Sequence, residues 1–508
     1  MAKRRDSRTR RSSGGINQLP YANLKSPYDP FPVLSADAVE FVHRRSLDLL
    51  EEFGCNFMLD EARDLLKAAG ADVEPGSQRV RFDRHFVEEK IKTVPKSFTL
   101  TARNPKHSLT VGHNHINFMM VASAPNTSDL DRGRIPGTLA TLTELIKLSQ
   151  SLNICHGCQG YPVEPTDVPV PIRHLEAGRA MVKYTDKVMS GYGIGTRRLR
   201  EIHEINRIAL GVSPEVFAET TCMATMCNCN SPLQYDGHLT SGLIENAKKH
   251  QASIISPFTL SGAMSPVTLA GTLVQQNAEA LAGIVLSQVV KAGAPIIYGA
   301  FATNVDMKSG APAFGTPEYV KTTLACGQLA RRYGFPYRSS APSTSTVADV
   351  QGSYETAMSL WSCVLGHANF IKHTFGWQEG GLVTSFEKTI MDAELAQNFA
   401  EFMKPIEITE DDVGFETIQE VGPGGHFFGS AHTIARYESA FYAPMLSDWR
   451  NFESWQEAGS KDTLQRAHHI WKQLLAEYEE PALDPAVAEE LDAFVDRRIR
   501  EGGTPYGE

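Results

Sequence analysis

The feature that most constrains the fold is a series of short apolar runs that alternate with longer helix-like stretches from about residue 115 onward. Gly, Pro, Ser and Asn bound each run. Continuous apolar strands that alternate with amphipathic helices are typical of a parallel sheet covered on both faces. Eight such units close a barrel, so we predict a (β/α)8 TIM barrel over residues 113–383. The runs are "INFMMVASA", "NICHGCQG", "KVMSGYG", "VFAETTCMA", "ASIISPF", "APIIYGAF", "FPYRSSAP" and "HANFIKHTF".

An open doubly wound sheet is the alternative, but no GxGxxG turn follows the first run to support nucleotide binding there. Outside the barrel, residues 31–112 predict a helical region and a β-hairpin formed by "SFTLTAR" and "HSLTVG". Residues 384–508 predict a helical extension. Residues 1–30 begin with the basic run "MAKRRDSRTRRSSGG" and are expected to form a disordered tail.

The charge balance restricts the partners of the chain. It has 508 residues and a formal net charge of -10, whereas nucleic-acid binding needs a basic footprint. It has no apolar signal region and no run long enough for a membrane span, so a cytoplasmic protein is expected. The 8 cysteines are too sparse for a disulfide scaffold, and we expect no metal site. A homo-oligomer is compatible with these features.

In a TIM barrel the chemistry lies at the carboxyl ends of the strands. Aromatic residues recur after the apolar runs, whereas Lys and Arg are almost absent there. A sugar-phosphate site would need basic groups, but a quaternary ammonium needs ring faces and negative potential. No GxSxG, HExxH or Walker motif is present. This pattern suits a protein that positions a substrate against a reactive cofactor.

Four segments carry a family resemblance: "TSDLDRGRIPGTLATLTELIKLSQSL", "ADVQGSYETAMSLWSCVLGHANF", "GGLVTSFEKTIMDAEL" and "GPGGHFFGSAHTIARY". Over roughly residues 30–475 the chain resembles the trimethylamine:corrinoid methyltransferase family. The resemblance implies a TIM barrel and methyl transfer from a methylated amine to Co(I) of a corrinoid. It also implies that a separate small protein carries this corrinoid.

The archaeal trimethylamine enzymes of that family contain pyrrolysine, whereas this chain contains only standard residues. By context, the equivalent position lies in or near Ser343, Thr344 and Ser345. The resemblance therefore points to the non-pyrrolysine branch, whose members demethylate betaines such as glycine betaine. A quaternary amine already carries its positive charge, so its displacement needs less activation.

For such a substrate the sequence offers ring faces, hydrogen-bonding groups and carboxylates. Phe375 and Trp377 are the first cage candidates, and Tyr298 and Tyr192 are further ones. His373, Asn228 and Asn304 can hydrogen-bond a substrate carboxylate. Asp349 and Glu379 are expected to add negative potential, and Glu355 is a further functional candidate.

Two other functions remain open. One is a barrel methyltransferase that passes the methyl group directly to tetrahydrofolate. The other is a protein that binds a quaternary amine without catalysis.

Overall fold

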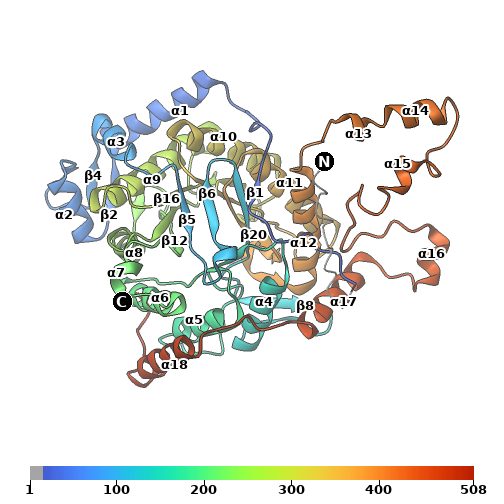
Figure 1. Cartoon of the computed structure of the whole chain (residues 1–508). Helices are drawn as coiled ribbons and strands as arrows, with labels where there is room; N and C mark the ends of the chain where they lie inside the picture. The colour runs from blue at the N-terminus through green and yellow to red at the C-terminus, as the bar shows by residue number, and fades with distance from the viewer. Residues whose placement is uncertain (1–14, 508) are drawn as a thin grey trace.

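The computed structural model describes residues 15–507, and its centre is a parallel barrel (Figure 1). Strand β20 pairs with β7, and the order from one side of the sheet to the other is β11-β10-β7-β20-β19-β16-β14-β12. The eight strands are β7 (His115–Met120), β10 (Gly157–Gln159), β11 (Val188–Ser190), β12 (Ala224–Cys227), β14 (Ala252–Ile255), β16 (Ile296–Gly299), β19 (Tyr337–Ser340) and β20 (Phe370–Phe375).

Side chains bridge the seam between β11 and β12. The backbone N–H of Ala224 donates to Ser190 Oγ at 3.0 Å, and Gln159 Nε2 donates to the Ala224 carbonyl at 2.8 Å. These bonds join the two edges of the sheet. The predicted TIM barrel is thus confirmed as a nearly closed barrel.

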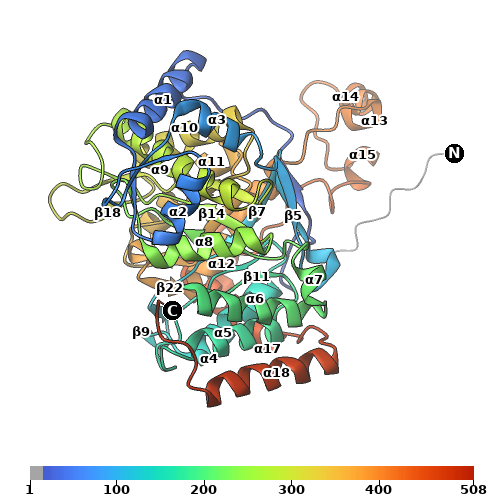
Figure 2. The same ribbon diagram turned by 90° about the vertical axis from the view of Figure 1, so that its left-hand side faces the viewer.

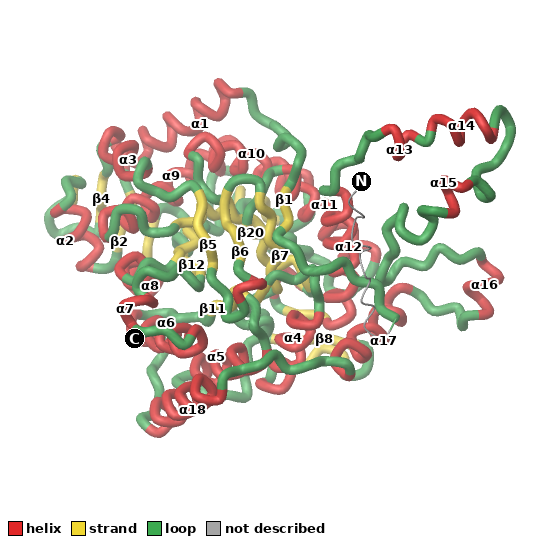
Figure 3. Tube along the Cα trace, viewed as in Figure 1, coloured by secondary structure: helices red, strands yellow, loops and turns green. Residues whose placement is uncertain are grey.

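Each barrel strand precedes one helix of the outer layer, and Figure 3 shows the strands inside a ring of helices. The helices are α4 (Leu139–Ser151), α5 (Arg173–Tyr184), α6 (Thr196–Leu210), α8 (Gly237–Lys248), α9 (Leu269–Val290), α10 (Pro317–Tyr333), α11 (Val350–Leu365) and α12 (Phe386–Phe402). One predicted run differs from the structure: Val216 and Phe217 belong to the short helix α7 (Pro214–Phe217), and β12 begins only at Ala224. Pro214 and the capping Ser213 favour that helical turn.

The predicted hairpin is confirmed by strands β5 (Ser97–Leu100) and β6 (Leu109–Gly112), which pair antiparallel. Leu100, Leu109 and Val111 of this hairpin pack with residues at the beginnings of the barrel strands, including Ala224 and Phe370. The hairpin therefore closes the amino end of the barrel. The hairpin leaves the carboxyl end of the strands uncovered.

The rest of the N-terminal region flanks this hairpin. Helices α1 (Ala36–Asp48), α2 (Asp60–Ala68) and α3 (Arg84–Ile91) pack on α9. The first part of the predicted tail, residues 1–14, lies outside the described residues. Residues 15–30 contact the body: β1 (Leu24–Lys25) pairs with β7, and Leu19 N–H donates to Gln397 Oε1 at 2.7 Å. This half of the predicted tail is held because the backbone of Leu24 and Lys25 finds a strand partner.

The C-terminal region consists of two parts. Helices α17 (Thr463–Ala476) and α18 (Pro485–Arg500) pack on the outer layer, α17 on α12 and α18 on α5 and α6 (Figure 2). Between α12 and α17, residues 404–457 form an arm that projects from the body (Figure 1). The arm contains α13 (Glu410–Val413), α14 (Phe415–Val421), α15 (Ala431–Ile434) and α16 (Phe452–Glu457). Among residues 15–507 no helix combines the length and the apolar character that crossing a membrane requires.

Candidate active site

Two small sheets form the rim at the carboxyl end of the barrel. Strands β8 (Asn126–Asp129) and β9 (Gly133–Pro136), which follow barrel strand β7, join β21 (Trp377–Gln378) and β22 (Val383–Ser385), which follow β20. On the side of β14 and β16, β15 (Leu260–Ser261) pairs with β17 (Thr303–Val305), which pairs with β18 (Pro312–Ala313). The rim therefore raises the walls of the barrel mouth and fixes the loops that carry aromatic residues.

Five rings gather around the carboxyl ends of strands β14, β16 and β20. We call Phe258, Phe301, Phe314, His373 and Trp377 the ring cluster. Phe301 stacks on Phe314 with centroids 5.1 Å apart and planes 8° apart. Trp377 meets both edge-on, at 6.3 Å and 6.1 Å. Phe258 stacks on Phe301 at 5.1 Å, and His373 lies 4.2 Å from Trp377. Such ring faces attract a cation, most strongly when water is excluded.

The end of β20 is bent so that His373 and Trp377 meet. His373 has a positive φ of 59°, where the pairing of β20 with β7 shifts register, and its Nδ1 accepts from Ala122 N–H at 3.3 Å. Gly376, at φ 85°, makes the turn, and its N–H donates to Asp392 Oδ2 at 2.8 Å. Asp392 is buried and paired with Lys388 at 2.6 Å. An anchored ion pair under the turn therefore sets the direction of the indole.

Burial keeps His373 uncharged. Loss of water, and then the neighbouring charges of Lys372 and Arg338, hold the pKa of His373 well below its ordinary value. The imidazole is therefore neutral near pH 7. A neutral ring beside Trp377 does not repel a bound ammonium group.

Two basic side chains lie inside the barrel next to the ring cluster. Arg338 donates to Ser256 Oγ at 2.9 Å, and β16 separates its strand from the strand that Ser256 follows. Lys372 donates to Tyr192 Oη at 3.2 Å, and β7 and β10 separate β20 from β11. Both contacts therefore cross the barrel interior. Arg338 is 1% exposed and Lys372 2% exposed.

Several polar atoms at the carboxyl ends of the barrel strands are buried and make no hydrogen bond within the described chain. Buried polar groups are nearly always paired, so such a concentration is typical of a site that binds a polar ligand or water. The atoms are Ser123 Oγ, Gln159 Oε1, Tyr161 Oη, Asn228 Oδ1, Arg338 Nε and Trp377 Nε1.

The three predicted carboxylates stabilise loops and a helix around the site. Glu355 is buried in α11, and its Oε2 accepts from the N–H groups of Thr344 and Ser345 at 2.6 Å and 3.0 Å. It therefore holds the loop that follows β19. Asp349 caps α11 by accepting from Gly352 N–H at 3.1 Å, and that bond lowers the pKa of its carboxyl.

Glu379 belongs to the rim and is not free to face a cationic ligand. Arg134 Nε lies 3.2 Å from each oxygen of its carboxylate, and the Glu379 N–H donates to the Ser345 carbonyl at 2.9 Å. The arginine offsets the negative potential that the sequence suggested. The Glu379–Arg134 pair thus joins β9 to the loop after β21.

The structure sorts the other predicted residues into two groups. Tyr192, beside Lys372, and Asn228, with its unpaired Oδ1, lie at the mouth. Tyr298 points outward instead, and its hydroxyl donates to Gln276 and Asn277 of α9 at 3.1 Å and 3.0 Å.

Asn304 and Phe375 also lie apart from the ring cluster. Asn304 Oδ1 accepts from Thr316, the cap of α10, at 3.1 Å. Phe375 is fully buried in the main core. These two side chains support the fold around the mouth.

The sequence-based prediction considered residues that follow the apolar runs, and it did not include Arg338, Lys372 or Phe314. The two cations lie within the apolar runs "FPYRSSAP" and "HANFIKHTF" rather than after them. A charged residue inside a barrel strand is unusual, because such strands are buried on both faces. That anomaly is the signal by which the sequence could have identified them. Phe314 comes from β18's loop and has no comparable signal.

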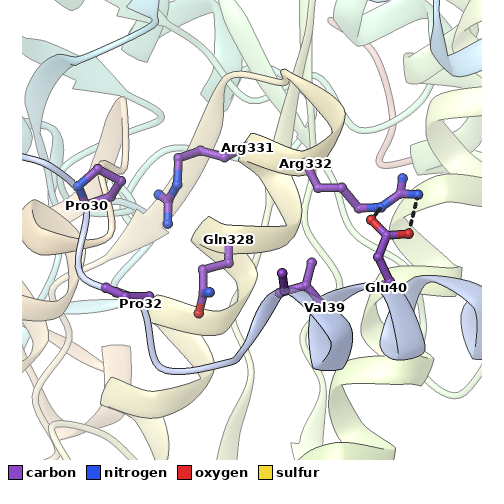
Figure 4. A pocket seen from close by; sticks show the side chains of 8 residues that line it. Pro30, Pro32, Val39, Glu40, Gln328, Arg331 and Arg332 are labelled. Carbon is purple, nitrogen blue, oxygen red and sulfur yellow. Dashed lines mark hydrogen bonds and ion pairs between the residues drawn. The ribbon is translucent and has the colours of Figure 1, made fainter.

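Other features of the chain do not form a site of this kind. The eight cysteines are buried and free, and within residues 15–507 no cluster of His, Cys, Asp and Glu has the arrangement of a metal site. A hollow of about 340 Å³ lies between the segment before α1 and helix α10 (Figure 4). Its Arg332 is paired with Glu40 and its Gln328 binds the backbone of Leu34. The hollow therefore has its polar groups already paired.

Comparison with known proteins identifies the family. The family model described as "Trimethylamine methyltransferase (MTTB)" matches residues 1–503. The chain belongs to this family. It is a methyltransferase of the MTTB family, and the resemblance noted in the sequence is confirmed.

Individual relatives cover nearly the whole chain. It is 37% identical to the glycine betaine methyltransferase of Desulfitobacterium hafniense strain Y51, over 93% of this chain and 98% of the relative. It is 26% identical to the trimethylamine methyltransferase MttB of D. hafniense strain DSM 10664 / DCB-2, over 91% and 93%. Among solved structures, the hydroxylamine complex of MtmB matches with a TM-score of 0.50 at 11% identity, over 89% and 90%. This likeness supports the barrel fold of the chain.

Proposed function

We propose that the protein transfers a methyl group from a quaternary ammonium substrate to the Co(I) corrinoid of a separate protein. The observation that carries this proposal is the ring cluster at the barrel mouth of an MTTB-family methyltransferase. The ring faces suit an ammonium that carries methyl groups, because methylated nitrogen cannot donate ordinary hydrogen bonds. The similarity to a glycine betaine methyltransferase favours a betaine as that substrate.

The reaction needs little acid–base chemistry from the chain. The electron pair of Co(I) forms a bond to one N-methyl carbon, and the C–N bond breaks with its pair staying on nitrogen. The corrinoid becomes methyl-Co(III), and the amine leaves as a neutral tertiary amine that needs no proton to depart. The neutral His373 and the paired Glu379 are compatible with this chemistry.

The protein's contribution is positioning and exclusion of water. Holding the nitrogen between rings in the mouth directs one methyl group toward the open end, where a carrier protein has access. The closed amino end of the barrel prevents entry from the other side. Trp377 and Phe314, fixed by their mutual packing, restrict rotation of the bound substrate.

A spectroscopic assay tests the proposal. Purified protein, glycine betaine and a corrinoid protein reduced to Co(I) are mixed, and the visible spectrum is followed for methyl-Co(III). We expect methyl transfer, and about a tenfold or greater loss in Trp377→Ala, because a desolvated cation–π contact contributes about 2 kcal/mol. Trp449→Ala is the matched control, since that indole is exposed on the arm.

The outcomes separate the alternatives. Methyl transfer to tetrahydrofolate without corrinoid would establish the folate alternative. Tight betaine binding without turnover on either acceptor would indicate a binding protein. Equal losses in Trp377→Ala and Trp449→Ala would contradict the role of the ring cluster.

A further inference from the structure

Arg338 and Lys372 are buried basic side chains that lack the partners such groups usually have. The polar partners of Arg338 are the hydroxyls of Ser256 and Ser340, and that of Lys372 is the hydroxyl of Tyr192. Among residues 15–507, no carboxylate forms an ion pair with either side chain. A buried charge normally has a counter-charge or a full set of acceptors, because removal from water is costly.

The same chain shows what satisfied buried lysines look like. Lys187 donates to the carbonyls of Ser149, Leu152 and Cys155, each at 2.8 Å. Lys388 pairs with Asp392 and donates to Thr356 Oγ1. Lys372 is as buried as these two but has one hydroxyl. The contrast shows that the lack of acceptors is specific to the barrel mouth.

Arg338 has an unpaired nitrogen and lies next to the ring cluster. Arg338 Nε makes no hydrogen bond, and the Cζ atom of Arg338 lies 5.2 Å from the centre of the Phe301 ring. A ligand that reaches Arg338 therefore also meets the ring cluster. Register places Arg338 beside Gly299, two residues before Phe301, so Arg338 lies deeper in the barrel than that ring. Lys372 pairs with Ser340 and directly precedes His373 of the ring cluster.

We propose that Arg338 and Lys372 bind the carboxylate of a zwitterionic substrate whose quaternary nitrogen lies against the ring cluster. This inference rests on the proposed function and names the substrate class of the same site. The deep carboxylate supplies the counter-charge that the chain lacks, and it points the methyl groups toward the mouth. Amines without a carboxylate, such as choline or tetramethylammonium, would bring a positive charge close to Arg338 without a counter-charge and are rejected.

Protonation of Lys372 is linked to this binding. Burial, and then the charge of Arg338, hold the pKa of Lys372 well below its ordinary value, and the groups that face it are Tyr192, Arg338 and His373. A carboxylate beside the amine favours its charged form. Above the pKa of the free protein's lysine, substrate binding is therefore accompanied by proton uptake, and affinity falls as pH rises.

Binding of two half-substrates to the full chain, measured by calorimetry without corrinoid, tests the site. 3,3-Dimethylbutanoate has the shape and carboxylate of glycine betaine but no charge at the quaternary centre, and choline has the ammonium without the carboxylate. We expect glycine betaine and 3,3-dimethylbutanoate to bind, and choline to bind at least about 100-fold more weakly than glycine betaine. Choline affinity equal to that of glycine betaine would overturn the proposal.

Substitutions of Arg338 and Lys372 test whether these two side chains bind the carboxylate. In Arg338→Met we expect glycine betaine affinity to fall about 100-fold, and in Lys372→Met the buffer-dependent proton uptake to vanish. The thermal midpoint should stay or rise, because an apolar side chain replaces an uncompensated buried charge. Arg338→Lys keeps the charge and should restore part of the affinity. Arg331→Met is the matched control, because Arg331 donates to the Gly366 carbonyl away from the mouth.

The test distinguishes this inference from the proposed function. Wild-type affinity in Arg338→Met and Lys372→Met would overturn the carboxylate site and leave methyl transfer standing. Carboxylate-dependent binding without methyl transfer would keep the site and remove the enzymatic function. Methyl transfer from choline as fast as from glycine betaine would keep the enzyme and contradict the substrate class.

Discussion

The barrel mouth and the arm depart from the usual burial pattern in opposite directions. At the mouth, charged and polar side chains are buried, among them Arg338 and Lys372. On the arm, large apolar side chains are exposed, including Phe428 at 86% and Phe441 at 81%. The mouth lies inside a closed wall of strands and loops, whereas the arm projects from the body (Figure 1).

The difference shows how strongly each region is supported. Buried anchors hold the mouth: Asp392 fixes the turn at Gly376, and Glu355 fixes the loop at Thr344. The arm returns to the body where Glu394 accepts from the N–H groups of Met445 and Leu446. Substitutions at the mouth should therefore cost much more folding free energy than equivalent substitutions on the arm.

The largest effect is expected from breaking the ion pair under the mouth. Asp392→Ala leaves Lys388 buried without its carboxylate and leaves the Gly376 N–H without its acceptor. We expect the free energy of unfolding in urea to fall by about 3 to 5 kcal/mol. The matched change on the arm, Asp411→Ala, removes an exposed pair with Arg436 and should cost less than about 1 kcal/mol. Similar losses in both variants would contradict the comparison.

A smaller loss is expected from releasing the loop after β19. Glu355→Ala removes the acceptor of Thr344 N–H and Ser345 N–H, so we expect a loss of about 2 to 4 kcal/mol in the free energy of unfolding. Methyl transfer should fall with it, because Thr344 Oγ1 accepts from the N–H of Phe314 in the ring cluster. For Glu355→Gln we expect values of stability and methyl transfer between those of the wild type and Glu355→Ala. A complete loss of transfer with unchanged stability would instead show that Glu355 contacts the substrate.

Two glycines allow a finer comparison. At Gly381, with φ 106°, an added Cβ would lie 2.7 Å from the Trp377 indole, whereas at Gly424 on the arm, with φ 78°, it would meet nothing within 4 Å. Gly381→Ala should cost about 1 to 3 kcal/mol and change the tryptophan fluorescence, because strain and overpacking add. Gly424→Ala should cost about 1 kcal/mol from backbone strain alone and leave the fluorescence unchanged. Unchanged fluorescence in both would show that the indole adapts.

The smallest effect is expected on the exposed face of the arm. Phe441→Ser removes a ring that is 81% exposed, so the free energy of unfolding of the single chain should change by no more than about 0.5 kcal/mol. Denaturation at low protein concentration measures it. A loss above about 2 kcal/mol would show that the ring is buried in solution.

Much of the barrel was readable from the chain because parallel strands are buried on both faces and therefore appear as apolar runs. Ring residues such as Trp377 and His373 were also identifiable, since His373 lies near the end of the last run and Trp377 follows that run. The sequence could not show which alternate residues of each strand face the barrel interior. On β16, Gly299 faces the interior and Tyr298 faces α9, although either arrangement fits an uninterrupted apolar run.

The sequence by itself determined the barrel, the family and the aromatic character of the mouth, because periodicity and local motifs encode them. Only the tertiary structure decided which side chains meet inside. Arg338 contacts Ser256, 82 residues away, and Lys372 contacts Tyr192, 180 residues away. Closure of the barrel creates these contacts, and it also removes water from both cations. Their need for a counter-charge therefore appears only after the chain has folded.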